Sequence, residues 1–419
     1  MKVRLAYGRE GLDVNVPDSA DVVEPVFHPG LPDEEAALRD LLRNPMGSPP
    51  LKEMVRPSSR VAISVCDITR PIPNDRILPT VLAELAHVSR EQIVILVGTG
   101  SHRPNTPEEL SEMLGPQVVQ DYRVVNHTAF DKETLIYLGE TSTGIPVWID
   151  RLWVEADFRI AIGLVEPHFF AGFSGGPKLV APALLGIDSI MRLHAPDLIA
   201  HPNSTWGRID DNPLHAAIRE VASYAPIHFN LNVIVNRRHE IVRAYGGELK
   251  ASHKAACDEA RRIVMRAVPK PYDIVITTNS GYPLDQNLYQ TIKGVSAGAQ
   301  IVKDGGSIIC ASECSDGIPS HGQYGKILAS IKSLDEYLDI IRQPGYCVMD
   351  QWQVQMQAQI QRRANVYLKS SLSDEQVRAA HITPIRDVES ALESLIHAHG
   401  STATVCVLPE GPQTIPYIG

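Results

Sequence analysis

Two histidines are the side chains best suited to acid–base chemistry. His102 ends the segment Gly98-Thr99-Gly100-Ser101-His102, and His168 ends Glu166-Pro167-His168, each shortly after a predicted strand. An imidazole titrates near neutral pH, so two of them facing one pocket could serve as acid and base from opposite sides of a substrate. Other histidines fall on helical or loop stretches without companions, and we expect them on the surface: His87, His239, His253 and His397.

Lys178 ends a glycine-rich segment, Gly172-Phe173-Ser174-Gly175-Gly176-Pro177-Lys178. Glycines let the backbone approach a ligand closely, and a lysine placed there could bind an anion, act as an amine nucleophile or anchor a cofactor. A solvated surface lysine is the alternative. The segment is not a Walker phosphate loop, because Pro177 precedes the lysine and Leu179 replaces the Ser or Thr of that motif.

Arg70 is the candidate for binding a substrate carboxylate, because a guanidinium presents a planar fork to two oxygens. Asp67, three residues earlier, could orient it or simply cap a turn. His194 follows Lys178 by 16 residues and is either a metal ligand or a core histidine. The HExxH zinc motif is absent from the sequence. Gly98-Thr99-Gly100 does not complete a dinucleotide fingerprint, because Arg103 stands where the third glycine belongs.

The second half of the chain supplies a further polar face. Gln290 and Lys293 are three residues apart on a predicted helix and therefore share one of its faces. This face could close over the same pocket from a second domain. Trp352 is either a core residue or a pocket wall.

The elements that must position these residues alternate between short β-branched runs and stretches of helical period, which predicts an α/β fold with two domains and mostly parallel sheets. The predicted strands are residues 60–66, 92–97, 158–165, 229–235, 272–277, 307–310 and 402–408. The predicted helices are residues 75–86, 213–223 with Asn212 as N-cap, 251–266, 289–302 and 387–397. In open α/β sheets ligands bind beyond the carboxyl ends of strands, so we expect the polar loops to converge there, with the active site in the cleft between the domains.

Pro269 and Pro271 mark the best domain boundary, which divides the chain into residues 1–268 and 269–400, with 401–419 able to return to the first domain. The 419 residues carry 39 basic and 49 acidic side chains, a net charge of −10, which argues against nucleic-acid binding. The sequence has neither a long apolar run nor a secretory signal, so we expect a cytoplasmic protein without a membrane segment.

The ordered set of these segments resembles the nickel-dependent lactate racemase family of 2-hydroxy acid racemases and epimerases. The resemblance runs over residues 60–352 and rests on these segments: Asp67-x-Thr69-Arg70-Pro71, Gly98-x-Gly100-x-His102-Arg103, Glu166-Pro167-His168, the Gly172–Lys178 segment, His194 and Gln290-x-x-Lys293. Each motif alone is weak, whereas their common order is specific.

The resemblance implies a nickel pincer nucleotide, a pyridinium mononucleotide whose thioamide and thiocarboxylate groups hold nickel through one carbon and two sulfurs. It implies a covalent link at Lys178, nickel ligation by His194 and acid–base roles for His102 and His168. It also places the substrate at Arg70, Gln290, Lys293 and Trp352. The remaining residues that it places at the cofactor are Asp67, Thr69, Gly172, Ser174, Gly175 and Gly176.

The implied reaction moves hydride from the substrate carbon to the cofactor and back, through a bound 2-keto acid, while the histidines move the hydroxyl proton. The implied partners are a small 2-hydroxy acid and the proteins that build the nickel cofactor. Two alternatives stay open: a carrier or storage protein for that cofactor, and a two-histidine epimerase or metal hydrolase that works without it. The sequence does not select among lactate, malate, and longer aliphatic, aromatic or sugar acids, and it leaves the oligomeric state open.

Overall fold

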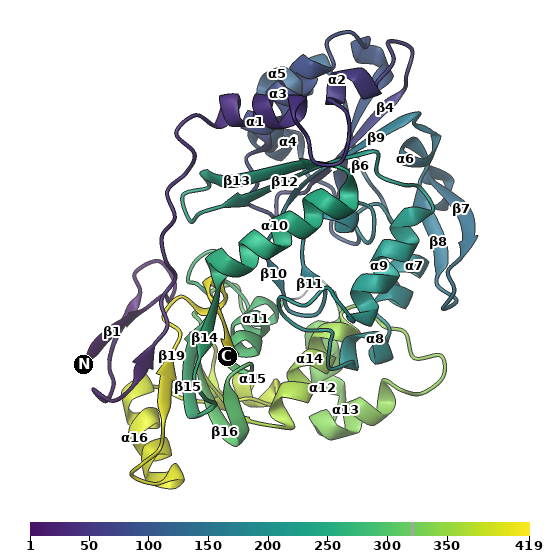
Figure 1. Ribbon diagram of the computed structural model, residues 1–419. Coiled ribbons are helices and arrows are strands. Elements are labelled where there is room, and N and C mark those ends of the chain that lie inside the picture. Colours follow the sequence, from purple (N-terminus) through teal and green to yellow (C-terminus); the bar gives the residue numbers. More distant parts are fainter. Residues whose placement is uncertain (320–321) are drawn as a thin grey trace. The chain divides into compact units, whose positions relative to one another are not determined.

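The computed structural model describes residues 1–319 and 322–419, which form two compact units (Figure 1). Residues 27–194 and 203–263 form one, here called the Lys178 unit. Residues 1–26, 195–202 and 264–419 form the other, the Lys293 unit. Both units are built on a six-stranded, mainly parallel sheet, which confirms the predicted α/β class.

The sheet of the Lys178 unit has the order β13-β12-β9-β4-β5-β6. All neighbours in it are parallel except β13, which is antiparallel to β12. Its strands are β4 (Val61–Cys66), β5 (Ile93–Gly98), β6 (Arg123–Asn126), β9 (Phe158–Leu164), β12 (Phe229–Val235) and β13 (Ile241–Gly247). Counted along the chain this is the order 3-2-1-4-5-6 of a doubly wound sheet, whose connections diverge between β4 and β9.

The two faces of this sheet differ because side chains alternate along each strand. Val61, Ile63 and Val65 point to an apolar face, where they pack in one core with leucines and isoleucines of α1 and α3. The opposite face carries small or polar residues at the alternate positions: Ala62, Ser64, Ala161, Gly163, Asn230 and Asn232. Only a closely fitting segment can lie against such a face.

Figure 1 labels the helices of this unit, which are interspersed with its strands along the chain. They are α1 (Glu34–Arg43), α2 (Leu51–Met54), α3 (Asn74–Glu84), α4 (Pro107–Leu114), α5 (Pro116–Asp121), α6 (Arg151–Glu155), α7 (Ile187–Leu193), α9 (Pro213–Ser223) and α10 (Leu249–Val264). The predicted cap of α9 is confirmed, because the Asn212 side chain accepts from the His215 amide. Two hairpins, β7 (Leu135–Glu140) with β8 (Pro146–Asp150) and β10 (Pro167–His168) with β11 (Gly172–Phe173), complete the unit.

The sheet of the Lys293 unit is wholly parallel, in the order β18-β17-β16-β15-β19-β3. Its strands are β3 (Asp21–Val22), β15 (Tyr272–Thr278), β16 (Val302–Ala311), β17 (Asn365–Lys369), β18 (Thr383–Pro384) and β19 (Val405–Val407). Ile274 and Ile276 face the core that contains α16 (Val388–His399). Val275 and Thr277 lie near Gly298 of α11 (Leu288–Gly298), so the two helices cover opposite faces.

The remaining elements of the Lys293 unit are shorter. They are β1 (Lys2–Leu5), β2 (Leu12–Asn15), β14 (Met265–Val268), β20 (Ile415–Ile418), α8 (Pro196–Ala200), α12 (Tyr324–Ser330), α13 (Leu334–Ile340), α14 (Gln351–Gln361) and α15 (Asp374–Ala379). Among the helices within the described ranges, none combines the length and apolar character needed to cross a bilayer.

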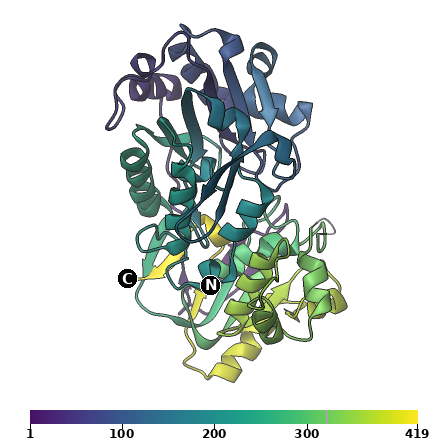
Figure 2. The same cartoon turned by 90° about the vertical axis from the view of Figure 1, so that its right-hand side faces the viewer.

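Several boundaries differ from the sequence prediction. Both chain ends, marked N and C in Figure 2, belong to the Lys293 unit, because β3 extends its sheet and β20 pairs with β14. Residues 1–26 therefore do not fold with the segment that follows them. The strand expected at 402–408 is β19, which pairs with β15 instead of returning to the first unit. Residues 265 and 266, expected at the end of the helix 251–266, instead begin β14. The strand expected at 307–310 is the longer β16.

Two histidines in the Lys178 unit are buried with their rings nearly parallel. Burial lowers the pKa of His215 to about 3 and that of His253 to about 4. Their ring centroids are 5.8 Å apart. His253 was expected on the surface from the sequence, and this is wrong, because only 5% of it is exposed.

Because these two rings stay neutral in the folded protein, we expect its free energy of unfolding to fall in acid. Between about pH 6.5 and about pH 4 the unfolded chain protonates them while the folded protein does not, so the free energy of unfolding falls on acidification by up to about 1.4 kcal/mol per pH unit for each ring. Above that range their contribution is constant. Urea unfolding of wild type and His253→Gln at several pH values should give a shallower slope for the variant. Equal slopes would contradict this.

Candidate active site

The loops after β4 and β9 meet at the point where the connections of the doubly wound sheet diverge, the position at which such sheets bind ligands. Arg70 comes from the first loop and Glu166 from the second. The Arg70 Nε lies 3.9 Å from the Glu166 Oε1, and the Arg70 side chain is 31% exposed. This ion pair is loose enough for the guanidinium to exchange its partner for another carboxylate.

Asp67 is the best-connected carboxylate at this edge. Its Oδ2 lies 2.7 Å from the Nδ1 of His102, and its Oδ1 accepts from the Thr69 hydroxyl at 2.5 Å. Burial by itself would raise the pKa of Asp67, but the hydrogen bonds from His102 and Thr69 hold it below its ordinary value. The ionised carboxylate accepts the Nδ1 proton of His102, so Nε2 of that ring carries the lone pair.

His168 has the opposite tautomer. It lies on the β10–β11 hairpin, where the backbone N–H of Ala171 donates to its Nδ1 at 3.3 Å. Because Nδ1 accepts, the neutral ring carries its proton on Nε2. The ring stacks on Phe169 at 5.0 Å and meets the edge of Phe170 at 4.6 Å between centroids.

Lys178 lies in a short 3₁₀ turn, Gly176–Leu179, on the small-residue face of the sheet. The Ser64 hydroxyl of β4 donates to the Leu179 carbonyl at 2.7 Å. A Cβ on Gly163 of β9 would come within 2.6 Å of the Leu179 side chain. The turn can therefore lie this close to the sheet only because β4 and β9 present Ser64 and Gly163 there.

His194 is the C-terminal cap of α7, and a backbone carbonyl holds its ring. Its Nδ1–H donates to the Ile190 carbonyl at 2.8 Å, which leaves the lone pair on Nε2. The pKa of His194 is lowered to about 4, mainly by burial, with a smaller contribution in the same direction from the charge of Lys178. A ring that is neutral at physiological pH, with one nitrogen fixed by a carbonyl, can offer the other nitrogen to a metal.

The glycine-rich segment makes tight contacts with the protein itself. A Cβ on Gly175 would lie 2.6 Å from the Asn232 Oδ1, and one on Gly176 would lie 2.5 Å from the His253 ring. A Cβ on Gly172 would meet the Arg208 carbonyl. The amide of Ser174 donates to the Glu166 carbonyl and that of Gly176 to Asn232. The glycines are therefore required by packing within the protein.

The predicted substrate residues of the second half belong to the Lys293 unit. Gln290 and Lys293 share α11, as expected, and Asn287 caps that helix. Trp352 lies in the first turn of α14 and is buried, and its Nε1–H donates to the Tyr289 hydroxyl at 3.1 Å. Tyr289, which the sequence did not single out, thus fixes the tryptophan next to Gln290.

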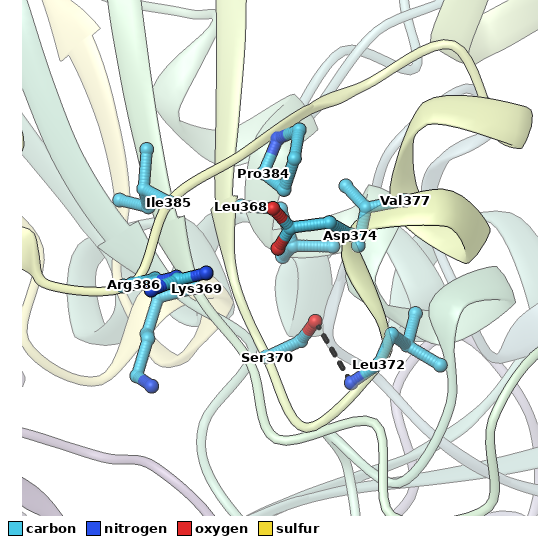
Figure 3. A pocket seen from close by; sticks show the side chains of 9 residues that line it. All are labelled: Leu368, Lys369, Ser370, Leu372, Asp374, Val377, Pro384, Ile385 and Arg386. Atoms are coloured by element: carbon cyan, nitrogen blue, oxygen red, sulfur yellow. Dashed lines mark hydrogen bonds between the residues drawn. The ribbon is translucent and has the colours of Figure 1, made fainter.

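Within the ranges that the structure describes, no three or more His, Cys, Asp or Glu side chains are grouped so as to hold a metal ion. A small cavity of about 130 Å³ lies elsewhere, at the carboxyl ends of β17 and β18 (Figure 3). Its lining, which includes Lys369, Asp374 and Arg386, contains none of the predicted site residues.

Comparison with known proteins matches both halves of the chain to one enzyme family. Residues 7–207 match the lactate racemase N-terminal domain and residues 267–415 the lactate racemase C-terminal domain. The lactate racemase of Thermoanaerobacterium thermosaccharolyticum is 34% identical over 91% of this chain and 90% of its own length. That of Lactiplantibacillus plantarum is 35% identical over 92% and 91%.

Solved structures also match this chain over nearly its whole length. The lactate racemase apoprotein of Thermoanaerobacterium thermosaccharolyticum has a TM-score of 0.93 and 31% identity, and the match covers 99% of this chain and all of the other. A Thermotoga maritima protein, 18% identical over 94% of this chain and all of its own, has a TM-score of 0.70 and shares the fold.

Two glycines with the same left-handed backbone offer a matched test of the packing around Lys178. Gly176 has φ +50° and Gly100 has φ +55°, but the nearest atom to a Cβ on Gly100 is 3.5 Å away. Gly100→Ala should cost about 1–2 kcal/mol of unfolding free energy from backbone strain alone. Gly176→Ala should cost about 1–3 kcal/mol more, because of the clash with His253. Equal losses of unfolding free energy in the two variants would show that the His253 ring can move away from the added methyl group.

Proposed function

Because this chain belongs to the lactate racemase family, we propose that it interconverts the enantiomers or epimers of a 2-hydroxy acid, using a nickel pincer nucleotide bound covalently at Lys178. The observation that carries the proposal is the convergence of Asp67, Arg70, His102 and Glu166 at the divergence point of one sheet. Lactate is the first substrate to test, because both curated relatives are lactate racemases.

Arg70 binds the substrate carboxylate in this proposal. Its guanidinium is partly exposed and only loosely paired with Glu166, so a carboxylate ligand can take that place. With the carboxylate held, the hydroxyl of one enantiomer faces His102 and that of the other faces His168. His102 receives the hydroxyl proton at Nε2, and Asp67 stabilises the resulting imidazolium through Nδ1.

The residues around Lys178 and His194 fit the proposed cofactor. His194 offers one neutral nitrogen from a buried position, and the remaining nickel ligands belong to the nucleotide. When bound, the cofactor would supply a reversible hydride acceptor for the substrate carbon. The protein holds the cofactor through Lys178 and moves the hydroxyl proton. Thr69 supports the site indirectly, because its hydroxyl donates to Asp67.

Gln290, Lys293 and Trp352 are proposed to bind the substrate from the Lys293 unit. The first two share α11, and the hydrogen bond from Trp352 to Tyr289 fixes the indole beside that helix. The proteins that synthesise the nickel cofactor are the proposed partners.

The first experiment measures the mass of the Lys178 peptide, with metal analysis, after production beside a complete nickel-pincer biosynthetic pathway. We expect a nucleotide-sized adduct on Lys178 and one nickel per chain, both lost in Lys178→Ala. An unmodified Lys178 without nickel, beside a family member loaded in parallel, would leave a two-histidine enzyme that works without the cofactor.

A chiral assay of the loaded protein across 2-hydroxy acids tests the reaction. Removal of either acid–base group, in His102→Ala or His168→Ala, should lower kcat by about a hundredfold or more while the adduct on Lys178 is kept. If the loaded wild type has no racemase activity but passes its cofactor to another protein, the chain is a carrier.

Asp67→Asn tests the charge beside His102. The amide oxygen can still accept the Nδ1 proton, so the ring keeps its orientation but loses the negative partner of the imidazolium. We expect kcat to fall by about a hundredfold or more, with KM little changed. Thr69→Ser, which keeps a hydroxyl for the Asp67 Oδ1, is the matched control and should stay near wild type. A similar loss in both variants would contradict the role of the charge.

A further inference from the structure

The loop that ends in Lys178 is held from its buried side by two imidazoles that none of the motifs contains. The Nδ1 of His215 lies 3.0 Å from the Ala171 carbonyl oxygen, and the Nε2 of His253 lies 3.0 Å from that of Ser174. A carbonyl can only accept, so each of these nitrogens carries a proton and donates it. Both bonds are buried, and the stacked rings fix each other's orientation.

Two buried amides extend the same contact. The Asn212 side chain donates to the Phe170 carbonyl at 3.0 Å, and the Gly176 amide donates to the Asn232 Oδ1 at 3.0 Å. With the histidines, four side chains from α9 with its cap, α10 and β12 thus hold the backbone from residue 170 to 176. We call them the loop clamp: Asn212, His215, Asn232 and His253.

Burying the four polar side chains of the loop clamp costs desolvation free energy, and the need to fold does not by itself explain why they are polar. A buried polar side chain loses its hydration and regains little net stability from a single hydrogen bond. Apolar residues at these positions would give an ordinary core. What the four polar groups add is a fixed path for the backbone between His168, two residues before Phe170, and Lys178, two residues after Gly176.

We propose that His215 and His253 are positioning residues, which hold the loop backbone so that Lys178 and His168 keep the fixed spacing that a covalently anchored cofactor requires. This inference rests on the proposed function for the role of Lys178, and on the hydrogen bonds alone for the hold on the loop. A catalytic group works only when its support keeps it within a fraction of an ångström of the productive position.

The matched variants are His253→Gln, whose amide can still donate to the Ser174 carbonyl, and His253→Leu, which cannot. In the unloaded protein we expect the amides of residues 172–178 to exchange hydrogen at least about tenfold faster in His253→Leu, and within about threefold of wild type in His253→Gln. Tyr337→Phe, which removes a buried hydrogen bond from Tyr337 to the Gln351 carbonyl, controls for general loosening.

In the protein produced with the cofactor pathway, His253→Leu should carry the adduct on at most about a tenth as many chains as wild type, or lose a similar factor in kcat, with recovery in His253→Gln. Unchanged exchange in His253→Leu would overturn the proposal. The proposal would also be overturned if His253→Leu and His253→Gln lost adduct or kcat equally and hydrogen exchange became faster throughout the Lys178 unit. That result would indicate that His253 serves only packing. Absence of the adduct from wild type would refute the proposed function, while the exchange measurement would still decide whether the clamp exists.

Discussion

The packing of the Gly172–Leu179 segment against the small-residue face of one sheet is the constraint on which the site depends. Ser64 and Gly163 leave room for the turn at Lys178, and Asn232 receives the Gly176 amide from the same face. A larger residue at any of these strand positions would push the lysine away from the sheet. The alternation of apolar and small residues along β4, β9 and β12 therefore serves both the core and the site.

Four histidines of the Lys178 unit differ in the partners of their ring nitrogens. His194, His215 and His253 donate to backbone carbonyls in buried surroundings that keep the rings neutral. His102 instead donates its Nδ1 proton to the ionised Asp67 carboxylate. Histidine thus supplies a candidate metal ligand, structural donors and a candidate proton acceptor in one unit. Burial and the partner of Nδ1 or Nε2 decide which of these each ring can be.

The strand order is that of dinucleotide-binding sheets, yet the first loop of the sheet carries Asp67, Thr69 and Arg70 in place of three glycines. The glycines lie after β9, where they serve close packing against the protein. A doubly wound topology thus fixes where a ligand site lies, since loops diverge there, while the chemistry depends on which side chains the loops carry. The membership of the chain in the lactate racemase family agrees with this reading of the loops.

The sequence by itself determined the α/β class, most strands and helices, the cap at Asn212 and the family, because periodicity, capping and motif order are local or ordered along the chain. Only the tertiary structure decided that residues 1–26 join the Lys293 unit. It also decided that the Asp67 carboxylate accepts a hydrogen bond from His102, and that His253 is buried against Gly176. Each of these depends on contacts between segments far apart in sequence. An isolated histidine on a helix looks the same whether that face meets water or a carbonyl, and only packing distinguishes the two.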